Sequence, residues 1–236
     1  VYDDPFASDL GAFSVGAKHV FAGGAELQAS GLWQKKDFTA VVALAVASSP
    51  AAVSTLVGNK VLFFGLIIAQ LGLVVYLSAR VAKMAPATAG TLFLAYSALT
   101  GVTFSLILLA YTGASVANTF FITAGMFGAL AVYGSVTKRD LTGMGRFMFM
   151  GLVGLVIASV VGIFWQNDAM QFVMGVVGVL VFSGLIAYDT QRLRAMALEV
   201  SGEQAGSYAI VGALSLYLDF INLFISLLRL FGDRRN

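Results

Sequence analysis

The sequence of 236 residues contains no cysteine and only one histidine, His19, and these absences exclude several kinds of site. Without cysteine there is no disulfide, no thiolate zinc site and no cysteine nucleophile. A single histidine cannot surround a metal ion, and His19 lies in the charged N-terminal stretch rather than in a candidate membrane span. Serine protease and metal hydrolase chemistry are therefore not expected, and no cofactor is expected either.

Charged residues are scarce as well, because Asp, Glu, Lys and Arg make up 11% of the chain, against about 25% in ordinary globular proteins. The 14 Lys and Arg and the 12 Asp and Glu residues give a formal net charge of +2, too balanced for a nucleic-acid-binding protein. Hydrophobic residues make up 59% of the chain, and the mean hydropathy is +0.89. This composition predicts a polytopic integral membrane protein, with the lipid bilayer as its surroundings.

The hydrocarbon core of a bilayer is about 30 Å thick, so a crossing helix needs about 20 apolar residues. Seven segments, uncharged except for Asp219 in the last, approach this length and predict an all-α bundle of seven transmembrane helices. Ser48-Ser49-Pro50 interrupts the first segment, and a turn at 112–115 separates the third from the fourth. The predicted spans are 38–59, 61–79, 87–111, 116–137, 147–165, 169–188 and 208–228.

Two of these segments carry small residues at four-residue spacing, as helices do where they pack closely in lipid. Because the chain has 26 glycines, such spacings also arise by chance, and both explanations remain open. The two stripes are Gly154, Ala158 and Gly162 in the fifth segment, and Ser97, Gly101 and Ser105 in the third.

The distribution of Lys and Arg over the short loops predicts the orientation in the membrane. Ten of the 14 basic residues lie before the first span or after the second, fourth and sixth, so this side and the N-terminus are expected to be cytoplasmic. Arg229, Arg234 and Arg235 conflict with the pattern, because seven full crossings would place them outside. Either the seventh segment crosses fully, or it re-enters and returns the basic tail to the cytoplasm. The ten residues are Lys18, Lys35, Lys36, Arg80, Lys83, Lys138, Arg139, Arg146, Arg192 and Arg194.

An acidic residue inside a membrane span is costly and marks a candidate functional site. Asp219 lies about 11 residues, or about 17 Å, into the seventh segment and therefore near the middle of the membrane. Ser215, Asn222 and Ser226 share its helical face, so a polar stripe runs along an apolar segment. This stripe predicts an ion pathway or gate. The alternative is a structural acid that is hydrogen-bonded by hydroxyl groups of the helix.

Asp189 ends the sixth span in the string AYDTQ, and Arg192 and Arg194 follow it. It could be an interfacial acid that pairs with one of these arginines. If the sixth and seventh segments are antiparallel neighbours, the Asp189 and Asp219 carboxylates could instead meet inside the bundle. Two unit charges about 4 Å apart repel by about 4 kcal/mol at an effective dielectric constant of about 20, so the pair would share a proton and act as a pH-sensitive switch. Its oxygens are also the ligands that Ca²⁺ prefers.

A paired-aspartate intramembrane protease is the one enzyme that these acids permit. The glycine-flanked aspartate expected of such an enzyme is absent, since Asp189 lies in AYDTQ and Asp219 lies in YLDFIN. The chain is therefore predicted not to be an enzyme.

Four strings form a pattern over about residues 39–232: TAGMFGALAVYG at 123–134, TKRDLTGMGRFMFMGLVG at 137–154, AYDTQ at 187–191 and GALSLYLDFINLFISLLRLFG at 212–232. In this order they resemble the transmembrane Bax inhibitor motif family, the Bax inhibitor-1-like proteins, and in particular its bacterial members. The resemblance implies a bundle of seven helices, with the last at the centre, in the bacterial inner membrane. It also implies that Asp189 and Asp219 gate a pH-dependent calcium leak. Arg80, at the end of the second helix, would be a latch that binds one aspartate in the closed state.

The resemblance does not extend to residues 1–37, which form a segment of unknown structure before a membrane domain at 38–232 and a short tail at 233–236. Two functions follow from the family and the acids. The first is a passive pathway for Ca²⁺, gated when the aspartate pair binds H⁺. The second is a membrane interaction protein that restrains a membrane protease or another stress-response complex, in which case the acids are only structural.

Overall fold

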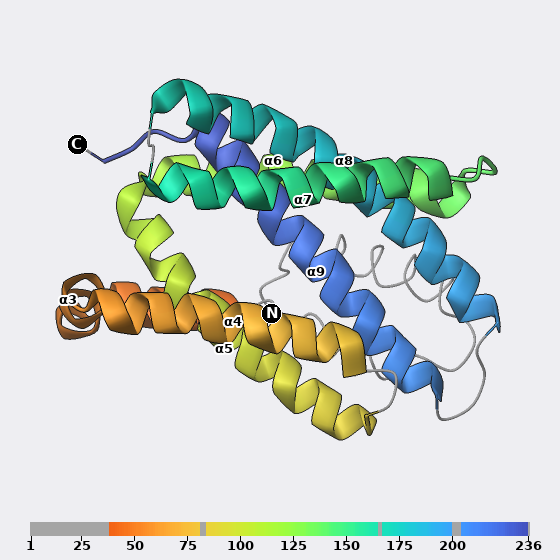
Figure 1. The fold of residues 1–236 in the computed structure, drawn as a ribbon, viewed down its shortest axis with the longest axis horizontal. Coiled ribbons are helices and arrows are strands. Elements are labelled where there is room, and N and C mark those ends of the chain that lie inside the picture. The colour runs from red at the N-terminus through yellow and green to blue at the C-terminus, as the bar shows by residue number, and fades with distance from the viewer. Residues whose placement is uncertain (1–37, 81–83, 165–166, 200–203, 236) are drawn as a thin grey trace, which may run out of the picture.

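The computed structural model describes residues 38–80, 84–164, 167–199 and 204–235 (Figure 1). Six helices in these ranges are long and apolar enough to cross a membrane, and a bent pair of shorter helices gives up to seven spans. The prediction of an all-α polytopic membrane protein is thus confirmed. The helices are Phe38–Ala47, α3 (Pro50–Gly58), α4 (Lys60–Arg80), α5 (Pro86–Ala110), α6 (Gly113–Val136), α7 (Thr142–Phe164), α8 (Asp168–Glu199) and α9 (Gln204–Phe231).

The first predicted span is broken rather than continuous. The helix Phe38–Ala47 and α3 meet at an angle of 88°. Pro50, at the start of α3, has no N–H with which to continue the preceding helix. The Ser49 side chain accepts a hydrogen bond from the Ala52 N–H and caps the new helix. The predicted span 38–59 is therefore a bent pair of helices, and the bend lies at the Ser-Ser-Pro interruption.

The other spans lie where the uncharged segments predict them, but some helices continue beyond the apolar stretch. α7 begins at Thr142 rather than at Phe147, and α8 continues past Tyr188 to Glu199. With 32 residues α8 is about 48 Å long, more than the roughly 30 Å of a bilayer core. Its last residues, RLRAMALE, are mostly good helix formers, so the helix continues where the apolar span ends.

α9 is the central helix of the described structure. In Figure 1 it passes between α4 and α5 on one side and α6, α7 and α8 on the other. It packs most extensively against α8, and also against α6 and α5. Its buried residues and their neighbours form three clusters, which agrees with the central position that the resemblance implies. The clusters are Val181, Phe182, Leu185, Ile186, Leu223 and Leu227 toward α8, Leu77, Phe93, Tyr96, Leu214 and Tyr217 toward α4 and α5, and Tyr111, Phe224 and Leu228 near the α5–α6 turn.

Of the two stripes of small residues, the one on α5 lies at a close helix contact and the one on α7 does not. On α5, Ser97 and Ser105 are fully buried, and a Cβ on Gly101 would come within 2.7 Å of the Thr39 carbonyl oxygen. This stripe is therefore a close packing face for the first described helix. On α7, a Cβ on Gly154 would meet nothing within 4 Å. The α7 spacing thus does not mark a close helix contact at that position.

The C-terminal residues lie at the same end of the bundle as the turn between α5 and α6 (Figure 1). The Thr112 N–H donates to the Asp233 carbonyl oxygen (3.0 Å), and the Arg235 N–H donates to that of Ala110 (2.9 Å). α9 starts at Gln204, at the opposite end, and is one continuous helix. The seventh segment therefore crosses the bundle fully, and the re-entrant alternative is wrong.

Candidate functional site: an aspartate pair inside the bundle

Asp219 is the buried acid of the central helix. Its side chain is only 6% exposed, and its Oδ2 atom has no hydrogen-bond partner. It lies about 18 Å, measured along the helix, from Phe231 at the end of α9. A buried carboxyl oxygen that is left unpaired costs free energy. A purely structural acid would not carry this cost, so Asp219 is a candidate for a functional role.

The polar stripe on α9 does not satisfy the Oδ2 atom of Asp219. Asn222 Nδ2 donates to the Leu218 carbonyl oxygen (2.8 Å), and Ser226 Oγ donates to the Asn222 carbonyl oxygen (2.7 Å). Both side chains therefore bond to their own helix. Ser226 also lies against Gly178 of α8, where any added Cβ would clash with its hydroxyl oxygen. The stripe thus brings α8 and α9 close together and leaves one oxygen of the acid between them without a bond.

Asp189 lies on α8, partly buried beside α9. It accepts a hydrogen bond from the Ser215 side chain of α9, and the Arg192 guanidinium, one turn further along α8, attracts it. The carboxyl groups of Asp189 and Asp219 are close enough to interact electrostatically. α8 and α9 are antiparallel neighbours, as the hypothesis of a coupled pair requires.

Two carboxyl groups on facing helices can hold a shared proton and contact a passing cation. They do not make a closed metal site, because Ca²⁺ takes about six to eight oxygen ligands. In the part of the chain that the structure describes, no three Asp, Glu, His or Cys side chains gather in one place. The pair therefore suits a brief contact with Ca²⁺ better than its retention.

Arg80, the predicted latch, is exposed at the end of α4. α4 packs mainly against α5 and α3. The cation that lies beside Asp189 is Arg192, on the same helix. An ion pair between Arg80 and Asp189 would require α4 and α8 to approach each other, and the latch stays a prediction.

A second group of polar side chains, which the charge pattern does not reveal, lies on the other side of α9. Gln70 Nε2 of α4 donates to Thr100 Oγ1 of α5 (2.8 Å), and Thr39 Oγ1 lies 3.1 Å from the Tyr217 hydroxyl of α9. Ser97 Oγ is buried in the same region without a hydrogen-bond partner. Together with the hydrogen bond from Thr39 Oγ1 to the Ser97 carbonyl oxygen (3.2 Å), these bonds join four helices. The sequence signal for them is Gln70, a polar residue halfway along an uncharged span.

A family model described as inhibitor of apoptosis-promoting Bax1 matches residues 37–236. The chain belongs to the Bax inhibitor-1-like family of membrane proteins. The match begins one residue before the first described helix of this Bax inhibitor-1-like protein. The predicted N-terminal segment, residues 1–37, lies outside the described residues.

Several curated bacterial proteins are similar to this Bax inhibitor-1-like protein over most of its length. Inner membrane protein YbhL of Escherichia coli strain K12 is 50% identical over 200 residues, which make up 84% of this chain and 86% of YbhL. An uncharacterized protein of Borreliella burgdorferi is 44% identical over 200 residues, with the same two shares. An uncharacterized membrane protein of Streptococcus pyogenes serotype M1 is 43% identical over 180 residues, 76% of this chain and 78% of its own length.

Proposed function

We propose that this Bax inhibitor-1-like protein is a pH-sensitive calcium leak pathway of the bacterial inner membrane, gated by protonation of the Asp189–Asp219 pair. The observation that carries the proposal is the Asp219 carboxyl group. It is buried within the bundle, one of its oxygens has no partner, and a second acid lies within electrostatic reach across the α8–α9 contact. Such a pair changes its shared charge when it gains or loses one proton.

The direction of gating follows from the cations around the pair. Ionised Asp189 attracts Arg192 and, in the predicted latch, Arg80 as well. Protonation weakens both attractions, and the loss of the one to Arg80, which would join α4 to α8, would remove a force that holds two helices together. The leak is therefore expected to rise as the pH falls, and Ca²⁺ would move passively down its gradient. The inner-membrane location rests on the name of the related protein YbhL.

The polar stripe supports a pathway along α9. Ser215, Asp219, Asn222 and Ser226 follow one another on the helix face that packs against α8. Their oxygens could replace part of the hydration shell of a cation once α8 and α9 separate. Separation would also free Ser215 from Asp189, so opening and proton binding would act on the same contact.

Calcium flux into proteoliposomes, measured at several pH values, tests the proposal. The wild-type protein should leak more at low pH, and Asp219→Asn should remove most of the pH dependence. Asp168→Asn is the matched control, because Asp168 is an exposed acid at the opposite end of α8 from Asp189. The control should keep the wild-type profile, whereas an unchanged profile in Asp219→Asn would overturn the proposal.

The alternative function, restraint of a membrane protease or of another stress-response complex, predicts a different result in the same vesicles. Wild-type and Asp219→Asn vesicles would then be equally tight to calcium at every pH. The flux measurement therefore separates the two functions without knowledge of the partner.

A further inference from the structure

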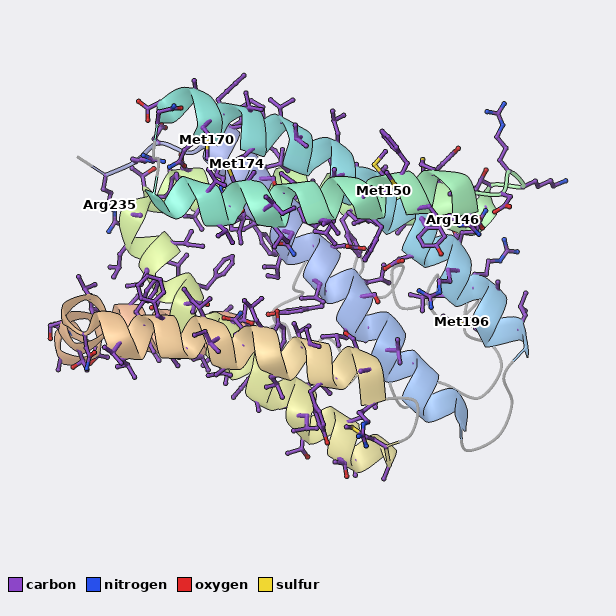
Figure 2. All side chains as sticks on the ribbon, in the orientation of Figure 1. Arg146, Met150, Met170, Met174, Met196 and Arg235 are labelled. Carbon is purple, nitrogen blue, oxygen red and sulfur yellow. The ribbon has the colours of Figure 1, made fainter. Side chains whose placement is uncertain are left out.

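A pocket of about 420 Å³ opens where the loop between α6 and α7 meets α8. Three of the eight described residues in its wall are basic, with Lys138 and Arg139 from the loop and Arg192 from α8. All three are exposed. Figure 2 shows the nitrogen-bearing side chains that surround this end of the bundle, near the labelled Arg146. The pocket is distinct from the buried contact between the two aspartates.

The frame of this pocket is held by specific contacts. Gln191 of α8 accepts a hydrogen bond from the Leu141 N–H (2.9 Å) and donates one to the Arg139 carbonyl oxygen (2.7 Å). Tyr188, one turn earlier, lies so close to Gly145 of α7 that an added Cβ would come within 2.5 Å of its ring. The loop, α7 and α8 are thus fixed to one another, and the basic side chains extend from a defined frame.

The charge of the pocket is positive. Asp140 is the one acid among the described residues that line it. Its Oδ1 accepts the Thr142 N–H (2.8 Å) at the start of α7. Hydrogen bonds with Thr142 and, more weakly, the charge of Arg146 lower the pKa of Asp140, so this acid stays ionised and acts at the helix start. The three basic residues of the wall then face one anion that already has partners, although Arg192 also attracts Asp189 of the same helix.

The position of the pocket along the bundle indicates which ligands can reach it. α6 ends at Val136 and α7 begins at Thr142, so the loop lies where two membrane spans end. In a bilayer this is the level of the lipid headgroups. Lys and Arg bind phosphate oxygens through charge-assisted hydrogen bonds, and basic pockets between helices at this level bind anionic headgroups.

We propose that this pocket binds the phosphate of an anionic phospholipid, with Lys138, Arg139 and Arg192 as its cationic contacts. A zwitterionic headgroup would bring its own positive charge into a site that already has an excess of cations, so the site should discriminate against it. Arg192 also attracts Asp189 of the proposed gate, so the double variant Lys138→Gln/Arg139→Gln, which leaves the gate unchanged, tests this proposal independently of calcium flux.

Native mass spectrometry of the purified full chain in detergent, titrated with phosphatidylglycerol or phosphatidylcholine, tests this proposal. The wild-type protein should retain phosphatidylglycerol in preference to phosphatidylcholine. Arg192→Gln and the double variant Lys138→Gln/Arg139→Gln should weaken this binding by roughly fivefold for each cation removed. Arg235→Gln is the matched control, because it removes an exposed arginine at the opposite end of the bundle, and it should bind as the wild type does.

Competition with inorganic phosphate distinguishes a lipid headgroup from soluble phosphate as the source of the bound oxyanion. Inorganic phosphate should displace little phosphatidylglycerol, because it lacks the acyl chains that hold a lipid at this depth. Displacement at comparable concentrations would identify soluble phosphate as the ligand and overturn the lipid assignment. Equal retention of both lipids by the wild type, or an equal loss in Arg235→Gln and Arg192→Gln, would also overturn it. Lys138→Gln alone provides the test if the double variant does not fold.

Discussion

Gly134→Ala should push α6 away from α8 beside the aspartate pair. A Cβ on Gly134 would come within 3.0 Å of two backbone carbons of Ala187 and closer still to its carbonyl oxygen. Carbon atoms pack at about 3.5–4.0 Å, so the two helices must separate by roughly half an ångström or more. The obstacle is backbone rather than a flexible side chain, and overpacking of this kind costs about 1–3 kcal/mol. Ala187 precedes Asp189 by two residues, so the displacement reaches the proposed gate.

Gly125→Ala is the matched control on the same helix. An added Cβ on Gly125 would meet nothing within 4 Å, and Ala favours a helix over Gly by up to about 1 kcal/mol. In thermal unfolding of the purified protein, about 1 kcal/mol corresponds to roughly 2–4 °C for a chain of this size. Gly125→Ala should unfold at or above the wild-type temperature, and Gly134→Ala several degrees below it. Equal unfolding temperatures for the two variants would refute the argument from helix contact.

The remaining predictions concern gating and topology. Asp189→Asn and Asp219→Asn should each flatten the pH profile of calcium flux, and the double variant should add little, because each acid affects the titration of the other. Independent, additive shifts would show that the two acids are not a pair. Arg80→Ala should raise the leak at neutral pH and change it little at low pH, and Arg80→Lys should rescue only in part, because an ammonium group lacks the planar fork that binds a carboxylate with two bonds. A leak equal to that of the wild type at every pH would assign Arg80 to the membrane interface. A reporter fused after Lys138 should read cytoplasmic, and reporters at 112–115 and at the C-terminus should both read outside. Reversed signals from the first two would mean that the orientation is wrong.

The bounds of most spans can be predicted from the sequence because lipid imposes one rule on them. Every backbone polar group must be bonded within the span, so uncharged runs of about 20 residues become helices. α4, α5 and α6 accordingly lie close to the predicted ranges. The rule does not extend beyond the membrane, where helix propensity carries α8 on to Glu199. It also gives no angle for the break at Ser49 and Pro50, which depends on how the two helices pack.

The candidate site can be predicted where charge marks it and not where charge is absent. Asp219 interrupts an apolar run and Asp189 ends one, so both stand out in the sequence. Whether they meet depends on α8 and α9 being neighbours, which residue spacing cannot decide. Gln70 and Thr100 carry no charge, so their hydrogen bond cannot be predicted from the positions of the uncharged runs.

Hydrogen bonds between the C-terminal residues and the α5–α6 turn fix one end of α9 in the bundle. Two of these hydrogen bonds join main-chain atoms only, from Thr112 to Asp233 and from Arg235 to Ala110. Any rotation of α9 about its fixed end displaces the residues near Phe231 least and those near Gln204 most, so Asp219 moves less than the residues before it. Main-chain hydrogen bonds require that residues 233 and 235 be present but do not depend on their side chains. Substitutions at 233–235 would keep these two bonds and remove only the side-chain bonds that Asp233 makes with Ser115 and Arg234 makes with Gln171, whereas a chain shortened to Gly232 would release α9 at its fixed end.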